Sequence, residues 1–172
     1  MLKIRLLILS GLAILVLTAC GFQLRGDYQL AERLGKTDLQ LVDEYTHFSR
    51  KLIRSLERAG VELVTAEAAD SIIVVSKSAL TREVLSIGND ARVREFRLRL
   101  ELEFSVLEGG QDESGEDPGI RLRSQLLQQQ RDLRFDDGRV LATSREAEFL
   151  EEDMSDALVR LFMQRLSQLE PL

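Results

Sequence analysis

The sequence has no tryptophan, only two prolines, and a single cysteine and a single histidine among its 172 residues. The lone thiol of Cys20 cannot form an internal disulfide, and no second cysteine is present to complete a redox-active pair. This composition excludes the small domains that depend on disulfides or on cysteine-bound zinc for their stability. We therefore expect no metal site in this protein.

An excess of positive charge is absent as well. Lysine and arginine number 23 against 29 aspartates and glutamates, which gives a formal net charge of −6. Proteins that bind nucleic acid carry a basic surface, so this balance argues against general nucleic-acid binding. It leaves room for a local basic patch that binds an anionic lipid.

The first twenty residues have the composition of an export signal. Lys3 and Arg5 precede an apolar run over residues 6–17 that only Ser10 and Gly11 interrupt. A membrane-spanning helix needs about 20 apolar residues, and this run has roughly a dozen, so a cleaved signal peptide is favoured over a permanent span. The run leads into Leu-Thr-Ala-Cys, which resembles a bacterial lipobox.

Cys20 is therefore predicted to carry a lipid and to become the first residue of the mature chain. Acylation consumes a thiol that would otherwise be unpaired in an oxidising compartment. Several acyl chains make a practically permanent anchor, at about 0.8 kcal/mol per buried CH₂. The alternative is an ordinary signal peptide with an incidental cysteine. We expect a signal peptide over residues 1–19, a lipidated lead-in over 20–36 and a single domain over 37–172.

The most regular pattern in the chain lies between Phe96 and Val106, where apolar and polar residues alternate without interruption. Such alternation predicts a long strand with one face in a core and one face in water. Residues 88–90, Gly-Asn-Asp, predict a turn before it. Three other strands are predicted, over residues 38–42, over residues 71–75 with an interrupted extension to Ile87, and over residues 122–135.

Two segments have the apolar spacing of amphipathic helices. Thr46 can cap a helix over residues 47–59, and Gly60 can end it in the left-handed conformation. The second helix is predicted to begin at a capping box formed by Thr143 and Glu146 and to run almost to the end of the chain. Three consecutive strands between two such helices predict one sheet with both helices on a single face.

Candidate catalytic groups are few. His47 has no serine or cysteine beside it, and a histidine next to a helix start is commonly a surface residue. The acidic segment 112–117 lacks the ligand spacing of a calcium loop. Glu101 and Glu103 share a strand face with neighbouring arginines, which predicts surface ion pairs. No glycine-rich loop follows a strand and opens a helix, so we expect no cofactor and no enzyme.

The segment that begins at Cys20 resembles the mature N-terminus of the LPS-assembly lipoproteins, the LptE family. That family typically opens with cysteine, glycine, an aromatic residue, one variable residue, leucine and arginine, and this chain reads Cys-Gly-Phe-Gln-Leu-Arg up to Arg25. Residues 52–63, which end in Arg-Ala-Gly-Val-Glu-Leu, are similar to the family's first helix and its exit. The turn at 88–90 and a terminal helix near Glu152 follow in family order, so the resemblance covers essentially the whole mature chain.

This resemblance implies an α/β (α+β) sandwich, with two amphipathic helices packed on one face of a roughly four-stranded, mostly antiparallel sheet. It also implies a lipoprotein anchored on the periplasmic side of the outer membrane of a Gram-negative cell. Members of the family plug the β-barrel of LptD and assist the assembly of lipopolysaccharide into the outer leaflet. Gly21, in place of an aspartate, agrees with the usual sorting of such lipoproteins to the outer membrane. A polar barrel lumen is compatible with a domain that has charged surfaces.

The family is also thought to bind lipopolysaccharide through basic residues near the turn between the second and third strands. In this chain Arg92 and Arg94 directly follow that turn. Because the arginine fork suits phosphate, the resemblance makes Arg92 and Arg94, with Arg82, the predicted lipopolysaccharide-binding residues. Asp90 has the wrong sign for a phosphate. The alternative is a charged hairpin end exposed to water.

Two other classes of function remain open. One is a structural outer-membrane lipoprotein that holds a different envelope complex together. The other is a lipid-anchored periplasmic enzyme, which needs a converging set of polar residues that the sequence does not reveal.

Overall fold

The computed structural model describes residues 30–110 and 119–172. The predicted signal peptide, the lipidation site Cys20 with the motif behind it, and the acidic segment 112–117 lie outside the described residues. Among the helices of the described residues, none has both the length and the apolar character needed to cross a membrane.

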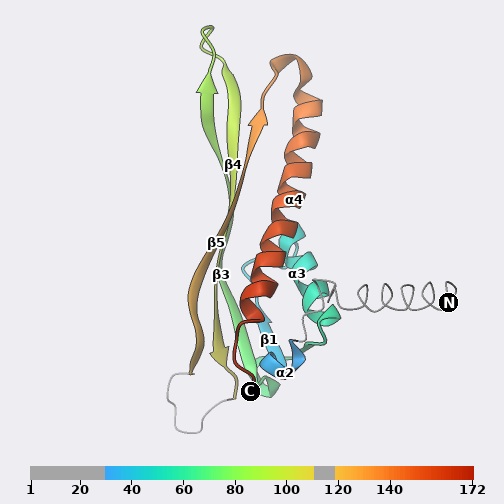
Figure 1. The fold of residues 1–172 in the computed structure, drawn as a ribbon. Helices are drawn as coiled ribbons and strands as arrows, with labels where there is room; N and C mark the ends of the chain where they lie inside the picture. Colours follow the sequence, from blue (N-terminus) through green and yellow to red (C-terminus); the bar gives the residue numbers. More distant parts are fainter. Residues whose placement is uncertain (1–29, 111–118) are drawn as a thin grey trace, which may run out of the picture.

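The described chain forms one five-stranded sheet with its helices along one side (Figure 1). The strands are β1 (Lys36–Gln40), β2 (Glu62–Leu63), β3 (Ser71–Ile87), β4 (Val93–Glu108) and β5 (Ile120–Arg134). They lie in the order β2-β1-β3-β4-β5. Strand β1 is parallel to both neighbours, whereas β3, β4 and β5 are antiparallel. The predicted sandwich with a mostly antiparallel sheet is confirmed, and the two-residue β2 adds a fifth strand.

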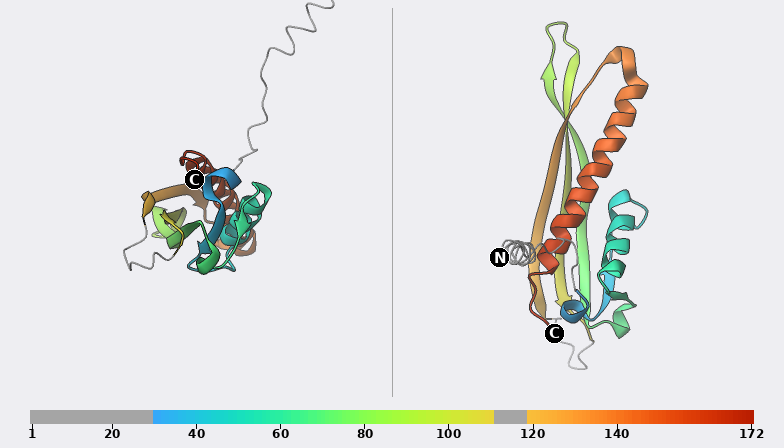
Figure 2. Two further views of the ribbon diagram at one scale, coloured as in Figure 1. Left: turned by 90° about the horizontal axis from the view of Figure 1, so that it is seen from below. Right: turned by 45° about the vertical axis from the view of Figure 1, so that its right-hand side comes forward.

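The helices are α2 (Ala31–Leu34), α3 (His47–Arg58) and α4 (Val140–Leu166), with short 3₁₀ turns η1 (Ala66–Ala68) and η2 (Asp137–Arg139). Figure 2 shows α3 and α4 on the same side of the sheet, as predicted. Helix α4 runs along most of the length of the molecule, whereas α3 covers only the half that contains β1 (Figure 1). The α2 turn lies within residues 20–36, the segment that was predicted to be the lead-in.

The start and end of α3 follow the sequence signals. The Thr46 side chain accepts a hydrogen bond from the Ser49 N–H at 3.1 Å, so the predicted cap is confirmed. Gly60 has φ +81°, the left-handed conformation that ends helices. Phe48 and Leu52 on the apolar side of the helix are buried.

The predicted capping box of α4 is wrong. The helix begins at Val140, three residues before Thr143, and the Thr143 hydroxyl donates to the Arg139 carbonyl at 3.2 Å instead of capping the helix. The reason is the preceding η2 turn, in which the Asp136 carboxylate accepts from the Gly138 N–H at 2.9 Å. This turn leads the backbone directly into the helical conformation.

The alternation predicted for β4 is confirmed, and the strand extends beyond both predicted ends. Its inward residues are buried between the sheet and the helices: Leu98, Leu100, Leu102, Phe104 and Val106. Phe104 lies against Phe162 of α4 with ring centroids 4.1 Å apart, and Phe162 in turn makes an edge contact with Phe48 of α3. These three rings join the sheet to both helices.

Strand β3 contains a bulge that reverses the direction of its side chains. Val75 pairs with Phe104 and Lys77 pairs with Glu103, so Ser76 is an extra residue in the register, and its hydroxyl donates to the Glu103 carbonyl at 3.3 Å. Before the bulge the odd-numbered residues face the helices, and after it the even-numbered residues do, because each bulge adds one residue to the period-two pattern. A second irregularity lies between Val84 and Ser86.

Candidate functional site

The predicted binding residues lie near the turn of the β3–β4 hairpin, at the end of the molecule where α4 begins and opposite the C-terminus (Figure 1). The Gly88 N–H donates to the Arg92 carbonyl at 2.7 Å and closes the turn. A Cβ on Gly88 would lie 2.6 Å from both the Arg94 Nε and an Asp90 carboxylate oxygen, so a larger residue there would require these two exposed side chains to move. Ala91 has φ +59°.

Arg92 and Arg94 both contact Asp90. The Arg94 guanidinium lies 2.7 Å from the Asp90 carboxylate, and the Arg92 Nε lies 3.9 Å from it. Partial desolvation raises the pKa of Asp90, but the Arg92 N–H and the charge of Arg94 outweigh it and hold the pKa below its ordinary value. Asp90 therefore stays ionised and offsets part of the positive charge that these two arginines present to an anion.

Arg82 has a different environment. Its guanidinium carbon lies 3.7 Å from the centre of the Phe96 ring and 5.9 Å from that of Phe135. The two rings contact each other edge to face, with centroids 5.4 Å apart. In the part of the chain that the structure describes, no carboxylate pairs with Arg82. The stack thus holds an exposed cation in place through aromatic contacts rather than through an acid.

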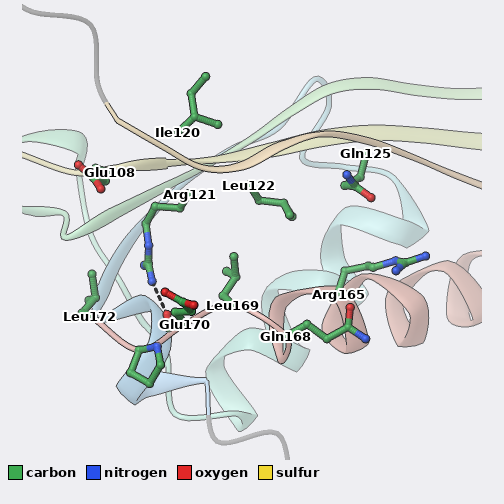
Figure 3. A pocket seen from close by; sticks show the side chains of 11 residues that line it. Glu108, Ile120, Arg121, Leu122, Gln125, Arg165, Gln168, Leu169, Glu170 and Leu172 are labelled. Atoms are coloured by element: carbon green, nitrogen blue, oxygen red, sulfur yellow. Dashed lines mark hydrogen bonds between the residues drawn. The ribbon is translucent and has the colours of Figure 1, made fainter.

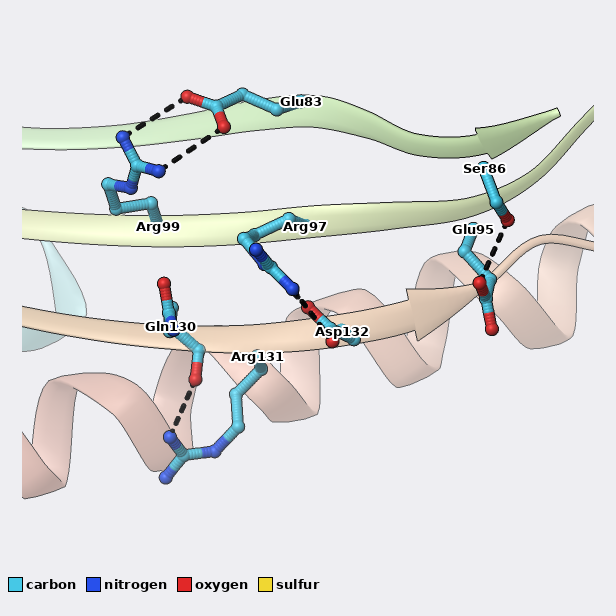
Figure 4. Close-up of polar contacts among 8 residues, drawn as sticks. All are labelled: Glu83, Ser86, Glu95, Arg97, Arg99, Gln130, Arg131 and Asp132. Carbon is cyan, nitrogen blue, oxygen red and sulfur yellow. Dashed lines mark hydrogen bonds and ion pairs between the residues drawn. The ribbon is translucent and has the colours of Figure 1, made fainter.

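The face of the sheet opposite the helices is covered by ion pairs that run across the strands (Figure 4). Arg97 donates to Asp132 of β5 from its Nε and one terminal nitrogen, at 2.8 and 3.2 Å. Arg99 contacts both carboxylate oxygens of Glu83 of β3 with its two terminal nitrogens, at 3.2 and 3.3 Å. We name this surface the ion-pair face. The predicted surface pairing is confirmed, but the partners come from neighbouring strands rather than from the same strand.

The ion-pair face also includes Lys77, whose ammonium lies 2.6 Å from the Glu101 carboxylate. The hydrogen bond from Lys77 lowers the pKa of Glu101, and the hydrogen bonds from Arg97 lower the pKa of Asp132. Both carboxylates are therefore ionised at neutral pH. The face is strongly polar, and its charges largely neutralise one another.

His47 contributes to a contact between the two helices. Its ring lies 3.5 Å from Asp156 and 3.9 Å from Glu152 of α4, and Lys51 lies 2.9 Å from Asp156. Burial raises the pKa of Asp156, but Lys51 and His47 outweigh it and hold that pKa below its ordinary value. No serine or cysteine hydroxyl or thiol is placed for activation by His47 in the described contacts. The cluster joins α3 to α4.

A cleft of about 760 Å³ lies at the opposite end of the molecule, between the start of β5 and the residues after α4 (Figure 3). Arg121 crosses it and donates to the Ser71 hydroxyl and to the Glu170 carbonyl, both at 2.7 Å. These bonds connect β5 to the C-terminal segment and to β3. Among residues 30–110 and 119–172, no group of histidine, cysteine and acidic side chains could hold a metal ion.

The structure thus separates the three predicted arginines into two environments. Arg92 and Arg94 share the Asp90 carboxylate, and Arg82 stacks on two phenylalanines. Sequence reasoning missed Phe96 and Phe135 as partners of Arg82, because the bulge at Ser76 decides which face Arg82 takes. The sequence did contain one signal for this site: Arg82 is a charged residue placed two residues after Leu80 and two residues before Val84, at alternate positions of one strand.

The chain was compared with families and proteins of known sequence. The profile of a family described as "LptE: Lipopolysaccharide-assembly" matches residues 34–166. A protein of Pectobacterium atrosepticum named "LPS-assembly lipoprotein LptE" is 34% identical over 105 residues, which cover 59% of this chain and 56% of that protein. A protein of the same name from Yersinia enterocolitica is 30% identical over 109 residues, covering 62% and 53%. The matched part therefore spans little more than half the length of these curated relatives.

Solved structures with a similar fold are also lipoproteins. The crystal structure of rare lipoprotein B from Shewanella oneidensis matches with a TM-score of 0.62 at 24% identity, over 77% of this chain and 94% of that one. The solution structure of lipoprotein B from Nitrosomonas europaea matches with a TM-score of 0.62 at 25% identity, over 86% and 90%. At 24% identity, the Shewanella oneidensis structure supports the fold alone.

Proposed function

Since the chain belongs to the LptE family of lipopolysaccharide-assembly lipoproteins, we propose that it forms a complex with the outer-membrane β-barrel LptD, which it plugs. In this complex it binds lipopolysaccharide and assists its assembly into the outer leaflet. The observation that carries the proposal is the family match over residues 34–166, which covers most of the described fold. The proposal assigns no catalytic step, because His47 takes part in the contact between α3 and α4.

The ion-pair face supports the plug role. The lumen of a transmembrane barrel is polar, and some barrels are filled by a folded plug. Arg97 and Arg99 are each already bound to a carboxylate, so the face can lie against a hydrated wall without leaving an isolated charge. A face of this kind suits a polar, wet contact better than a dry one.

The complex can be tested by purifying the full-length lipoprotein from native outer membranes in detergent. We expect a stable one-to-one complex with a large barrel protein that mass spectrometry identifies as LptD. Recovery of the lipoprotein with a different envelope assembly, and no barrel, would instead support the alternative of a structural lipoprotein. Turnover of a substrate that is lost on changing His47 would support an enzyme.

The membrane anchor is part of the proposal. Cleavage after residue 19 and acylation of Cys20 would attach residues 20–36 and the domain over 37–172 to the periplasmic side of the outer membrane. Mass spectrometry of the native N-terminus should find acyl groups on Cys20. A free thiol at that position, or cleavage elsewhere, would contradict the anchor.

The proposal places lipopolysaccharide contacts at the hairpin end, on Arg92 and Arg94 with Arg82. Arginine forks bind phosphate in two-pronged geometry, and these residues are exposed. Replacing both Arg92 and Arg94 by alanine should weaken lipopolysaccharide binding. The matched control is Arg54→Ala with Arg160→Ala, which removes the same charge from exposed positions on α3 and α4. Equal affinities of the two double variants would remove Arg92 and Arg94 from the site.

A further inference from the structure

On the helix-facing side of the sheet, the helices cover the side chains of β4 but leave part of the neighbouring β3 exposed. Leu80, Arg82 and Val84 of β3 pair directly with Leu100, Leu98 and Phe96 of β4. Leu100 and Leu98 are 6% and 3% exposed, whereas Leu80 and Val84 are 42% and 52% exposed. Paired residues on an antiparallel ladder point to the same face. On β4, Leu98 and Leu100 are buried and Phe96 is half-buried, whereas the β3 members are exposed. We name Leu80, Arg82 and Val84 the open strip.

The arrangement of the helices explains the difference. Helix α4 packs along β4 and β5, and α3 reaches only the other half of the sheet (Figures 1 and 2). Neither helix lies over β3 beyond the Ser76 bulge. The open strip is thus a piece of core-facing sheet that no element within residues 30–110 and 119–172 covers.

The centre of the open strip is a cation that is ready to bind an anion. Arg82 stacks on Phe96 at 3.7 Å, with Phe135 behind it, and no described carboxylate competes for it. A guanidinium that stacks by its face keeps its N–H edge available for a phosphate. Because the rings already fix the side chain, it loses less conformational entropy on binding than a free arginine would.

We propose that the open strip, with Phe96 and Phe135, is the subsite that binds the phosphorylated lipid end of lipopolysaccharide. The phosphate contacts the N–H edge of Arg82, and an acyl chain lies along Leu80 and Val84. This inference rests on the proposed function, and it deepens it by naming the part of the ligand that the site recognises. Charge complementarity selects the ligand, since an exposed cation between two exposed apolar side chains fits an amphiphile with a phosphate group.

The same geometry gives Arg82 a different role from Arg92 and Arg94. Those two arginines already contact Asp90, so a phosphate has to compete with a carboxylate for them. Among residues 30–110 and 119–172 no carboxylate competes for Arg82, and its two apolar neighbours add contact area for a chain. Phe96 and Phe135 act as positioning residues, because they hold the guanidinium rather than touch the phosphate.

The test measures binding of the full-length, detergent-solubilised lipoprotein to lipopolysaccharide and to the same lipopolysaccharide after removal of its phosphates. Arg82→Ala should weaken binding of the phosphorylated form about tenfold. It should leave the affinity for the dephosphorylated form unchanged. Arg54→Ala, which removes an exposed arginine from α3, should change neither affinity. Circular dichroism and thermal unfolding of each variant report whether the fold is retained.

Two further variants separate the parts of the subsite. Phe135→Leu keeps Arg82 but removes one ring, and should lower the affinity for the phosphorylated form only. Leu80→Gln with Val84→Gln should lower the affinity for both forms, because it removes the apolar contact. If inorganic phosphate at millimolar concentration displaces the whole ligand, the strip is a simple anion site and the inference is wrong.

The failures of the two proposals can be told apart. If the wild-type chain binds neither form of lipopolysaccharide, the proposed function itself is wrong. If the wild type binds the phosphorylated form and folded Arg82→Ala binds it equally well, only the inference about the open strip is overturned.

Discussion

The two halves of β3 have the same backbone pairing and very different surroundings. Val75, directly before the bulge at Ser76, is 4% exposed, and Val84, nine residues later on the same helix-facing side, is 52% exposed. Both are paired to β4 in an antiparallel ladder. The difference shows that a strand contributes to a core only where another layer covers it. One half of β3 therefore contributes to the core, and the other half stays exposed to solvent.

The largest expected effect lies in the covered half. Phe104→Ala removes a fully buried ring that packs 4.1 Å from Phe162. Loss of the transfer free energy and the remaining cavity should lower the free energy of unfolding by about 3–5 kcal/mol. Urea unfolding followed by circular dichroism measures it. A loss below about 1 kcal/mol would mean that the three-ring contact does not hold the helices on the sheet.

A matched pair of substitutions compares the two halves directly. Val75→Ala should cost about 2 kcal/mol of unfolding free energy, because it leaves a cavity in the core. Val84→Ala should cost less than about 1 kcal/mol, because its side chain already contacts water. The same urea experiment compares them. Equal losses would show that the open strip is covered in solution.

Acid should weaken the covered half through Asp156. The folded-state pKa of Asp156 is held below its ordinary value by Lys51 and His47, against the opposing effect of burial. This carboxylate therefore contributes stability above its unfolded pKa of about 3.9, and the contribution is lost as the pH falls through the lower folded pKa. Asp156→Asn should cost less than about 1 kcal/mol at pH 7, since the pair is partly exposed.

The measurement is unfolding free energy between pH 7 and pH 2. The wild type should lose stability more steeply below pH 4 than Asp156→Asn does, and the control Glu57→Gln, an exposed carboxylate on α3, should follow the wild-type curve. Parallel curves for wild type and Asp156→Asn would show that the contact between α3 and α4 does not depend on this charge.

The smallest effect is expected at the turn of the open half. Asp90→Asn removes the carboxylate that Arg92 and Arg94 contact, so lipopolysaccharide affinity should rise by about threefold at low salt. Added salt should diminish the gain. Titration of detergent-solubilised wild type, Asp90→Asn and Glu57→Gln measures it. An unchanged affinity would indicate that phosphate does not reach this turn.

Local signals in the sequence predicted much of this fold. The alternation from Phe96 to Val106 predicts a strand because its period is two, and Thr46 and Gly60 predict the ends of α3 because each satisfies a specific backbone requirement. The capping box at Thr143 failed because the η2 turn supplies an earlier start. A local capping motif predicts the start of a helix only where no preceding turn has already placed the backbone in the helical conformation.

The candidate site was less predictable. Arg82 lies in β3, Phe96 in β4 and Phe135 directly after the end of β5, and their contact depends on the register of β3 against β4. That register shifts at Ser76, where the sequence carries no glycine or proline to mark a bulge. The exposure of Leu80 likewise depends on how far α3 extends over the sheet. The periodicity of α3 or of β3 carries no information about that distance.

The bulge at Ser76 has a practical consequence for redesign. Ser76 is the one extra residue at the bulge, and the β4 partners of Val75 and Lys77, Phe104 and Glu103, are adjacent in the sequence. Ser76→Ala should therefore be well tolerated, and deletion of Ser76 should make the ladder regular while Arg82 keeps its partner Leu98 and its face. Insertion of one residue between Lys77 and Arg82 would instead turn Arg82 toward the ion-pair face, so an engineer who varies the even positions beyond Ser76 has to keep the length of that half of β3.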